Sequence, residues 1–117
     1  MVTLTVREEG SAPGNTVRHP VYVSQQLYEM IEMHARQSEQ TLSEWMRQAV
    51  IRWTIASSVP QLPPAPPRES LIRDRMMWVY LPPSLNAWVN QARGSASWST
   101  ALWSILQWAV THSEEGI

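Results

Sequence analysis

The chain contains two similar segments in order, and this internal repeat limits what it can fold into. Residues 21–53 begin with strand-like alternation in VYV and continue with two runs of apolar residues at three- and four-residue steps. Residues 76–110 repeat that order, with Val79 and Leu81 in the places of Val21 and Val23. Each segment predicts one strand and two helices. A unit of this size leaves a strand edge and two apolar helix stripes uncovered, so each copy needs the other.

The ends of the four predicted helices carry residues typical of helix termini. Ser24 is an N-cap for the first helix, and Thr41 or Ser43 for the second. In the second copy, the first helix opens with two prolines and ends at a glycine, and the next is capped by one of two serines; these are Pro82, Pro83, Gly94, and Ser97 or Ser99. The alternative is a chance likeness between two amphipathic patterns. Agreement of strand, cap and both helices in one order favours a true repeat.

The matching stretches are VYVSQQL with TLSEWMRQAV, and VYLPPSL with SWSTALWSIL. They resemble the ribbon-helix-helix (Arc/MetJ-type) family. This resemblance implies a mainly α fold with a small antiparallel β-ribbon, built here as a tandem pseudo-dimer within one chain. In that family the ribbon enters the DNA major groove, and the start of each second helix touches phosphate. Most members are homodimers, but some plasmid-transfer accessory proteins carry two copies in one chain.

The resemblance implies a site for double-stranded DNA. If Val21, Val23, Val79 and Leu81 face the helices, strand alternation fixes the opposite face. That face carries six residues: Arg18, Pro20, Tyr22, Met76, Trp78 and Tyr80. Phosphate contacts are expected at the starts of the second helices and near the second strand, at Thr41, Ser43, Ser97, Ser99, Arg73 and Arg75.

Only one residue of the ribbon face, Arg18, is a strong reader of bases. The aromatic residues Tyr22, Trp78 and Tyr80 are suited to thymine methyls, to stacking on unpaired bases, or to a protein partner. The N-terminal segment covering this face is a further alternative. A net charge of −1 is the main objection to DNA binding, because binders of nucleic acid usually carry a basic excess.

The sequence predicts five parts. These are an N-terminal strand or arm (1–16), a first repeat (17–56), a Pro-rich linker (57–72), a second repeat (73–112) and a tail (113–117), with both repeats in one compact domain. Alternation of Val2, Leu4 and Val6 favours an extra strand over a loose arm. Five prolines from Pro60 to Pro67 indicate an extended spacer, or alternatively a proline-rich ligand for a partner domain.

The chain has seven Trp and no Phe, which suggests a second function. Trp45, Trp103 and Trp108 fall partly off the expected core stripe, and the second repeat has few charges. Such a surface is typical of an interface. The rival hypothesis is therefore a protein-interaction module, antitoxin-like or a regulatory adaptor, with self-association or another protein as partner. A larger core than the stripe defines is the remaining interpretation.

Catalytic, metal and cofactor sites are not predicted. The chain has no Cys, and His19, His34 and His112 lack acidic neighbours at ligand spacing. No Gly-rich phosphate loop is present. The sequence therefore predicts no enzyme, no metal and no cofactor. No stretch matches a signal peptide or a membrane span, so a cytoplasmic DNA-binding protein, either a repressor or a plasmid- or phage-type accessory factor, is the expectation.

Overall fold

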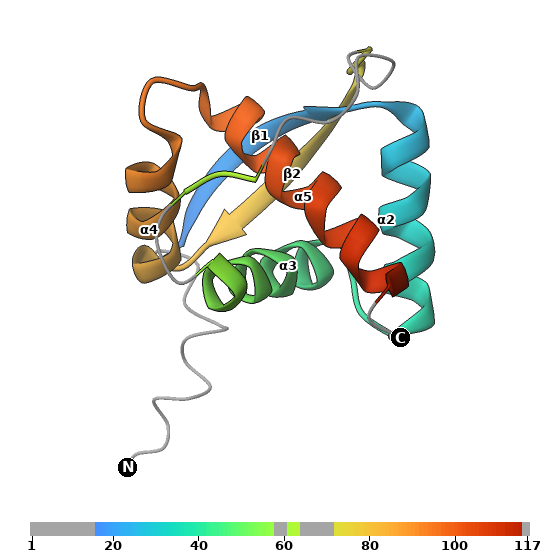
Figure 1. Cartoon of the computed structure of the whole chain (residues 1–117). Coiled ribbons are helices and arrows are strands. Elements are labelled where there is room, and N and C mark those ends of the chain that lie inside the picture. The colour runs from blue at the N-terminus through green and yellow to red at the C-terminus, as the bar shows by residue number, and fades with distance from the viewer. Residues whose placement is uncertain (1–15, 58–60, 64–71, 116–117) are drawn as a thin grey trace.

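The computed structural model describes residues 16–57, 61–63 and 72–115. Its elements follow the predicted order: β1 (Val17–Val23), α2 (Gln25–Gln37), α3 (Leu42–Ser57), β2 (Arg75–Leu81), α4 (Pro83–Arg93) and α5 (Trp98–Glu115). The two strands run through the middle of the molecule, α5 crosses them, and α2 and α4 lie at opposite sides (Figure 1). The prediction of a mainly helical fold with a two-stranded antiparallel sheet is confirmed.

The helix boundaries follow from local capping. The Ser24 hydroxyl accepts a hydrogen bond from the Leu27 backbone N–H at 3.0 Å, as predicted for the start of α2. Of the two candidates for each second helix, Thr41 caps α3 and Ser97 caps α5. Their hydroxyl oxygens accept hydrogen bonds of 3.1 Å from the backbone N–H groups of Glu44 and Thr100. Gly94 ends α4 with a φ of 54°, a conformation that a side chain disfavours.

The antiparallel register places Pro20 opposite Trp78, at the middle of the ribbon. The Tyr22 N–H donates to the Ser99 hydroxyl at 2.9 Å, so this N–H points away from β2 and toward α5. The nitrogen of Pro20, two residues earlier, lies along the same outer edge because the backbone alternates. The missing N–H of Pro20 therefore removes no hydrogen bond from the ladder.

One face of the ribbon and all four helices enclose the core. Val21, Val23, Val79 and Leu81 are buried, which confirms the predicted inward face of both strands. The α2 and α3 residues in the core are Leu27, Ile31, Ala35, Trp45, Met46, Ala49, Val50 and Trp53. From β2, α4 and α5 come Met77, Val89, Ala101, Leu102, Trp103, Ile105, Leu106, Ala109 and Val110.

Two tryptophans that were expected partly off the core stripe belong to the core, so that prediction is wrong for them. Trp45 is 3% exposed and Trp103 is 4% exposed. The reason is that α3 packs against α2, α5 and β2, while α5 packs against β1 and three helices. A helix with neighbours on several sides buries more than a single stripe. Trp88, Trp98 and Trp108 are partly buried against the same core.

Several predicted segments lie wholly or mainly outside the described residues. These are the N-terminal strand or arm and most of the linker, and the side chains of the tail are outside as well. Within the linker, residues 61–63 are described and form neither helix nor strand. Among the helices that are described, none combines the length and apolar character needed to cross a membrane.

Candidate nucleic-acid interface

The ribbon face opposite the core carries the six predicted side chains, and all six are exposed. Tyr22 is 45% exposed, Met76 42%, Trp78 36% and Tyr80 38%, and Arg18 and Pro20 are exposed as well. In the register, the three cross-strand pairs on this face are Arg18 with Tyr80, Pro20 with Trp78, and Tyr22 with Met76. The sequence pattern therefore located this surface correctly.

Arg18 is held over a tryptophan. Its guanidinium carbon lies 4.2 Å from the centre of the Trp78 ring, which is the diagonal neighbour across the ribbon. A cation over the face of an indole is attracted by the ring, and this contact needs none of the five guanidinium N–H groups as hydrogen-bond donors. No hydrogen bond or ion pair ties Arg18 to any other described residue. Arg18 is thus placed over Trp78 as a bidentate donor whose side-chain N–H groups no other described residue uses.

The starts of α3 and α5 flank the ribbon at opposite edges. Ser99, in the first turn of α5, lies at the edge of β1, because its hydroxyl accepts the Tyr22 N–H. Ser43, in the first turn of α3, lines a hollow of about 360 Å³ together with Trp78 and Tyr80 of β2. The capping residues Thr41 and Ser97 are exposed at these two ends. The predicted helix-start residues are thus gathered beside the exposed face.

Arg73 and Arg75 are not part of that face. Arg73 stacks on Trp103 of α5, with 4.4 Å between guanidinium carbon and ring centre. Arg75 stacks on Tyr28 of α2 at 3.8 Å and donates a hydrogen bond to the Gln25 side chain at 3.0 Å. Arg75 shares the register side of Met77, which packs inward, and the contacts of both arginines point toward the helices. Their clearest role is therefore to join the start of β2 to α2 and α5.

Comparison of the chain with models of protein families, with curated proteins and with solved structures finds no match. The interpretation of the site therefore depends on its geometry and charge.

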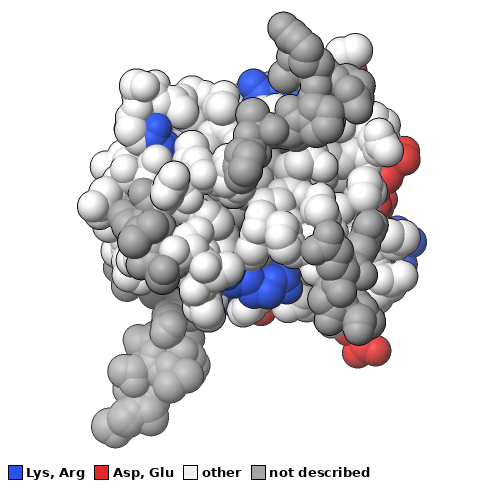
Figure 2. Space-filling model, in the orientation of Figure 1, with Lys and Arg blue, Asp and Glu red and all other residues white. Residues whose placement is uncertain are grey.

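Charge is distributed unevenly around the ribbon. The two strands contain Arg18 and Arg75 and no Asp or Glu. Glu44 lies in the first turn of α3 and pairs with Arg47 at 3.0 Å, whereas the first turn of α5 has no acidic residue. Figure 2 views the helix-covered side of the ribbon, where α5 crosses it; this side is mostly uncharged, and most acidic atoms in view lie toward α2. The absence of carboxylates within the two strands suits an anionic partner better than the overall charge of −1 indicates, although Asp74 directly before β2 and Glu44 of α3 are acidic.

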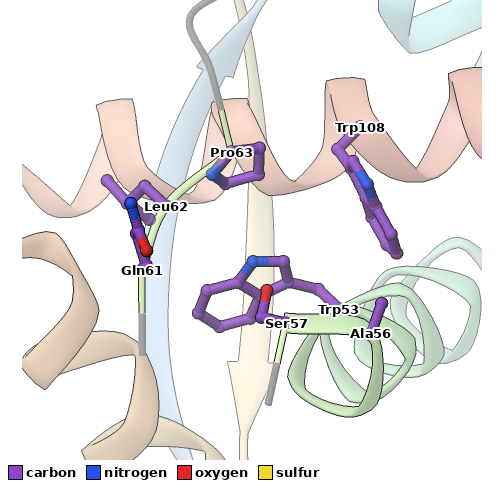
Figure 3. A pocket seen from close by; sticks show the side chains of 7 residues that line it. All are labelled: Trp53, Ala56, Ser57, Gln61, Leu62, Pro63 and Trp108. Carbon is purple, nitrogen blue, oxygen red and sulfur yellow. The ribbon is translucent and has the colours of Figure 1, made fainter. Parts of the chain in front are cut away.

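A second hollow lies away from the ribbon, between the end of α3, residues 61–63 and α5 (Figure 3). Its volume is about 320 Å³, and Trp53 and Trp108 form two of its walls. Among the described residues, the indole N–H of Trp53 finds no hydrogen-bond partner. The lining residues carry no charged side chain, and Ser57 and Gln61 are the polar side chains of this hollow besides the two indoles.

The histidines make structural contacts. His19 stacks on Trp98 with 3.8 Å between ring centres, and its Nε2 lies 2.7 Å from the Asn86 side-chain oxygen. His34 stacks on Trp45 with 5.8 Å between ring centres, and Nδ1 of His112 lies within hydrogen-bond distance of the Trp108 carbonyl oxygen. Within the described part of the chain, no three His, Cys, Asp or Glu residues are grouped closely enough to hold a metal ion.

Proposed function

We propose that this protein binds double-stranded DNA by placing the β1–β2 ribbon in the major groove, as a transcriptional repressor or a plasmid- or phage-type accessory factor. One observation carries the proposal: a ribbon face that no described helix covers, with six exposed side chains, lies between two capped helix starts. The major groove is about 12 Å wide and admits a two-stranded ribbon. Arg18 is the base reader, because a guanidinium donates in bidentate fashion to guanine O6 and N7.

In the same proposal, the two halves of the chain form a ribbon-helix-helix pseudo-dimer. The register supports this, because Pro20 and Trp78, which occupy matching places in the two repeats, face each other. Matching residues then lie symmetrically about that pair. Tyr22 and Tyr80 follow it by two residues, each on its own strand. A two-fold axis through the Pro20–Trp78 pair would relate the two repeats.

Phosphate contacts are assigned to the helix starts. Backbone N–H groups in the first turn of a helix, together with its dipole, favour an anion. Thr41 and Ser43 mark this position on α3, and Ser97 and Ser99 mark it on α5. Because the two starts lie at opposite edges of the ribbon, they suit the phosphates on both sides of one major groove.

Binding to duplex DNA should weaken steeply between about 50 and 200 mM salt, because phosphate contacts release counterions.

Glu44→Gln should strengthen binding by about twofold to fivefold, since it removes a negative charge beside the proposed phosphate contact of α3. Glu32→Gln is the matched control, because Glu32 pairs with Arg36 on α2. Fluorescence anisotropy measures all three proteins. A wild-type affinity that does not change with salt would refute the proposed electrostatic contacts.

A protein partner is the second candidate, and the composition of the ribbon face favours it. Tyr22, Met76, Trp78 and Tyr80 give this face an aromatic and apolar character that many protein interfaces share. The surface differs from the Trp-rich second half that the sequence suggested, since Trp103 is buried and Trp88, Trp98 and Trp108 pack on the core. Binding of protein without salt-dependent binding of DNA is the outcome that selects this candidate.

A further inference from the structure

The two ends of the exposed ribbon face are chemically different. At places that match about the central Pro20–Trp78 pair, one strand carries Arg18 and the other carries Met76. The central pair itself is unequal, a proline opposite a tryptophan. Among the matched positions of the exposed face, only Tyr22 and Tyr80 carry the same residue type in both halves. A duplex with identical half-sites would therefore meet different side chains on its two sides.

The unequal central pair also affects how Arg18 is held. Arg18 rests on the Trp78 ring at 4.2 Å, whereas a cation at position 76 would have Pro20 as its diagonal neighbour, with no aromatic ring. One half of the face thus has a pre-oriented cationic donor, and the other half has a thioether. A cationic side chain prefers guanine, whereas an apolar side chain prefers thymine, through its methyl group.

The helix starts differ in the same sense. The start of α3, where Glu44 and Arg47 form an ion pair, lies beside β2, next to a hollow lined by Met76, Trp78 and Tyr80. The Tyr22–Met76 end lies by the start of α5, which has no acidic residue in its first turn. An anion is less favoured beside Glu44 than beside α5. The base reader and the better phosphate site therefore lie at opposite ends.

From these differences we propose that the protein reads an asymmetric duplex in one orientation, which rests on the proposed function. Arg18 contacts a guanine on one side of the centre of the site. On the other side, Met76 and Tyr22 make apolar contacts that favour thymine, and no second guanine is required. The orientation-determining residue is Arg18, supported by Trp78.

The absence of cysteine makes the orientation directly measurable. Gln37→Cys adds one thiol at the exposed end of α2, just before the start of α3. This thiol is then labelled with an iron chelate, which cleaves DNA close to it. The probe is a duplex enriched from a random-sequence pool by the wild-type protein. We expect cleavage on one side of the enriched site only. Arg18→Met should weaken binding to this duplex by roughly 5- to 150-fold.

The exchange variant Arg18→Met/Met76→Arg provides the sharpest comparison. Both positions are exposed, so the variant should fold, and circular dichroism checks this. On the same duplex, cleavage should move to the other side of the site, because the cation now lies on the other half of the face. Equal cleavage on both sides by the wild type, or unmoved cleavage by the folded exchange variant, overturns the asymmetric reading while DNA binding stands. If no duplex is enriched and none binds at low salt, both the inference and the proposed function are wrong.

Discussion

Ile31→Ala and Leu106→Ala should each lower the free energy of unfolding by about 2–5 kcal/mol, the usual range for truncating a buried aliphatic side chain. Both side chains are 0% exposed, one on α2 and one on α5, so each truncation leaves a cavity between helices and ribbon. Urea denaturation followed by circular dichroism measures the change. Ile55→Ala is the control, because Ile55 is 74% exposed and its truncation should change stability by no more than about 0.5 kcal/mol. A loss below that value for Ile31 or Leu106 would contradict the packing of the core.

Val21→Asp should destabilise the fold by more than about 4 kcal/mol, because it places an unpaired carboxylate in the core. Val21 is fully buried, and its partner across the ribbon is Met77. The neighbouring change Tyr22→Asp should leave the protein folded, with a loss of about 1 kcal/mol or less, since Tyr22 faces solvent. DNA binding by Tyr22→Asp should nevertheless fall, because the new charge faces phosphate.

Thermal unfolding and anisotropy measured on these two adjacent variants separate the two faces of one strand. If both variants unfold, Tyr22 is more deeply packed than its exposure indicates. If Val21→Asp remains as stable as the wild type, the inward face of β1 has been assigned wrongly.

Much of the fold could be predicted because it depends on neighbours in the sequence. Capping by Ser24 involves residues three apart, and strand alternation decides which of Val21 and Tyr22 is buried. The internal repeat predicted in addition that the two strands pair with each other, since neither half covers its own apolar surface. These local rules placed all six residues of the exposed ribbon face.

The remaining features depend on contacts between distant segments, which periodicity does not reveal. Trp45 and Trp103 are buried because α3 and α5 have neighbours on several sides. Arg73 contacts Trp103, which lies 30 residues later in the sequence. The hydrogen bond from the Tyr22 N–H to Ser99 joins residues that are 77 positions apart. The stacking of Arg18 on Trp78 likewise requires the register of the ribbon. A charge pattern along the sequence treats all arginines alike, so it did not separate Arg18 from Arg73 and Arg75.

The most direct test of the account compares two arginines in one binding experiment. Arg18→Ala removes the cation on the exposed ribbon face, and Arg52→Ala removes an equal charge from the later part of α3, where Arg52 lies over Trp45. The change in net charge is the same, so position is the main difference. Binding of each variant to the enriched duplex is measured at low and at moderate salt.

We expect Arg18→Ala to cost about 1–3 kcal/mol of binding free energy and to relax the preference for one base. Arg52→Ala should change affinity by less than about threefold, because surface ion contacts far from the groove contribute little. Equal losses for Arg18→Ala and Arg52→Ala, or the absence of wild-type binding at low salt, would contradict the placement of the ribbon in the major groove.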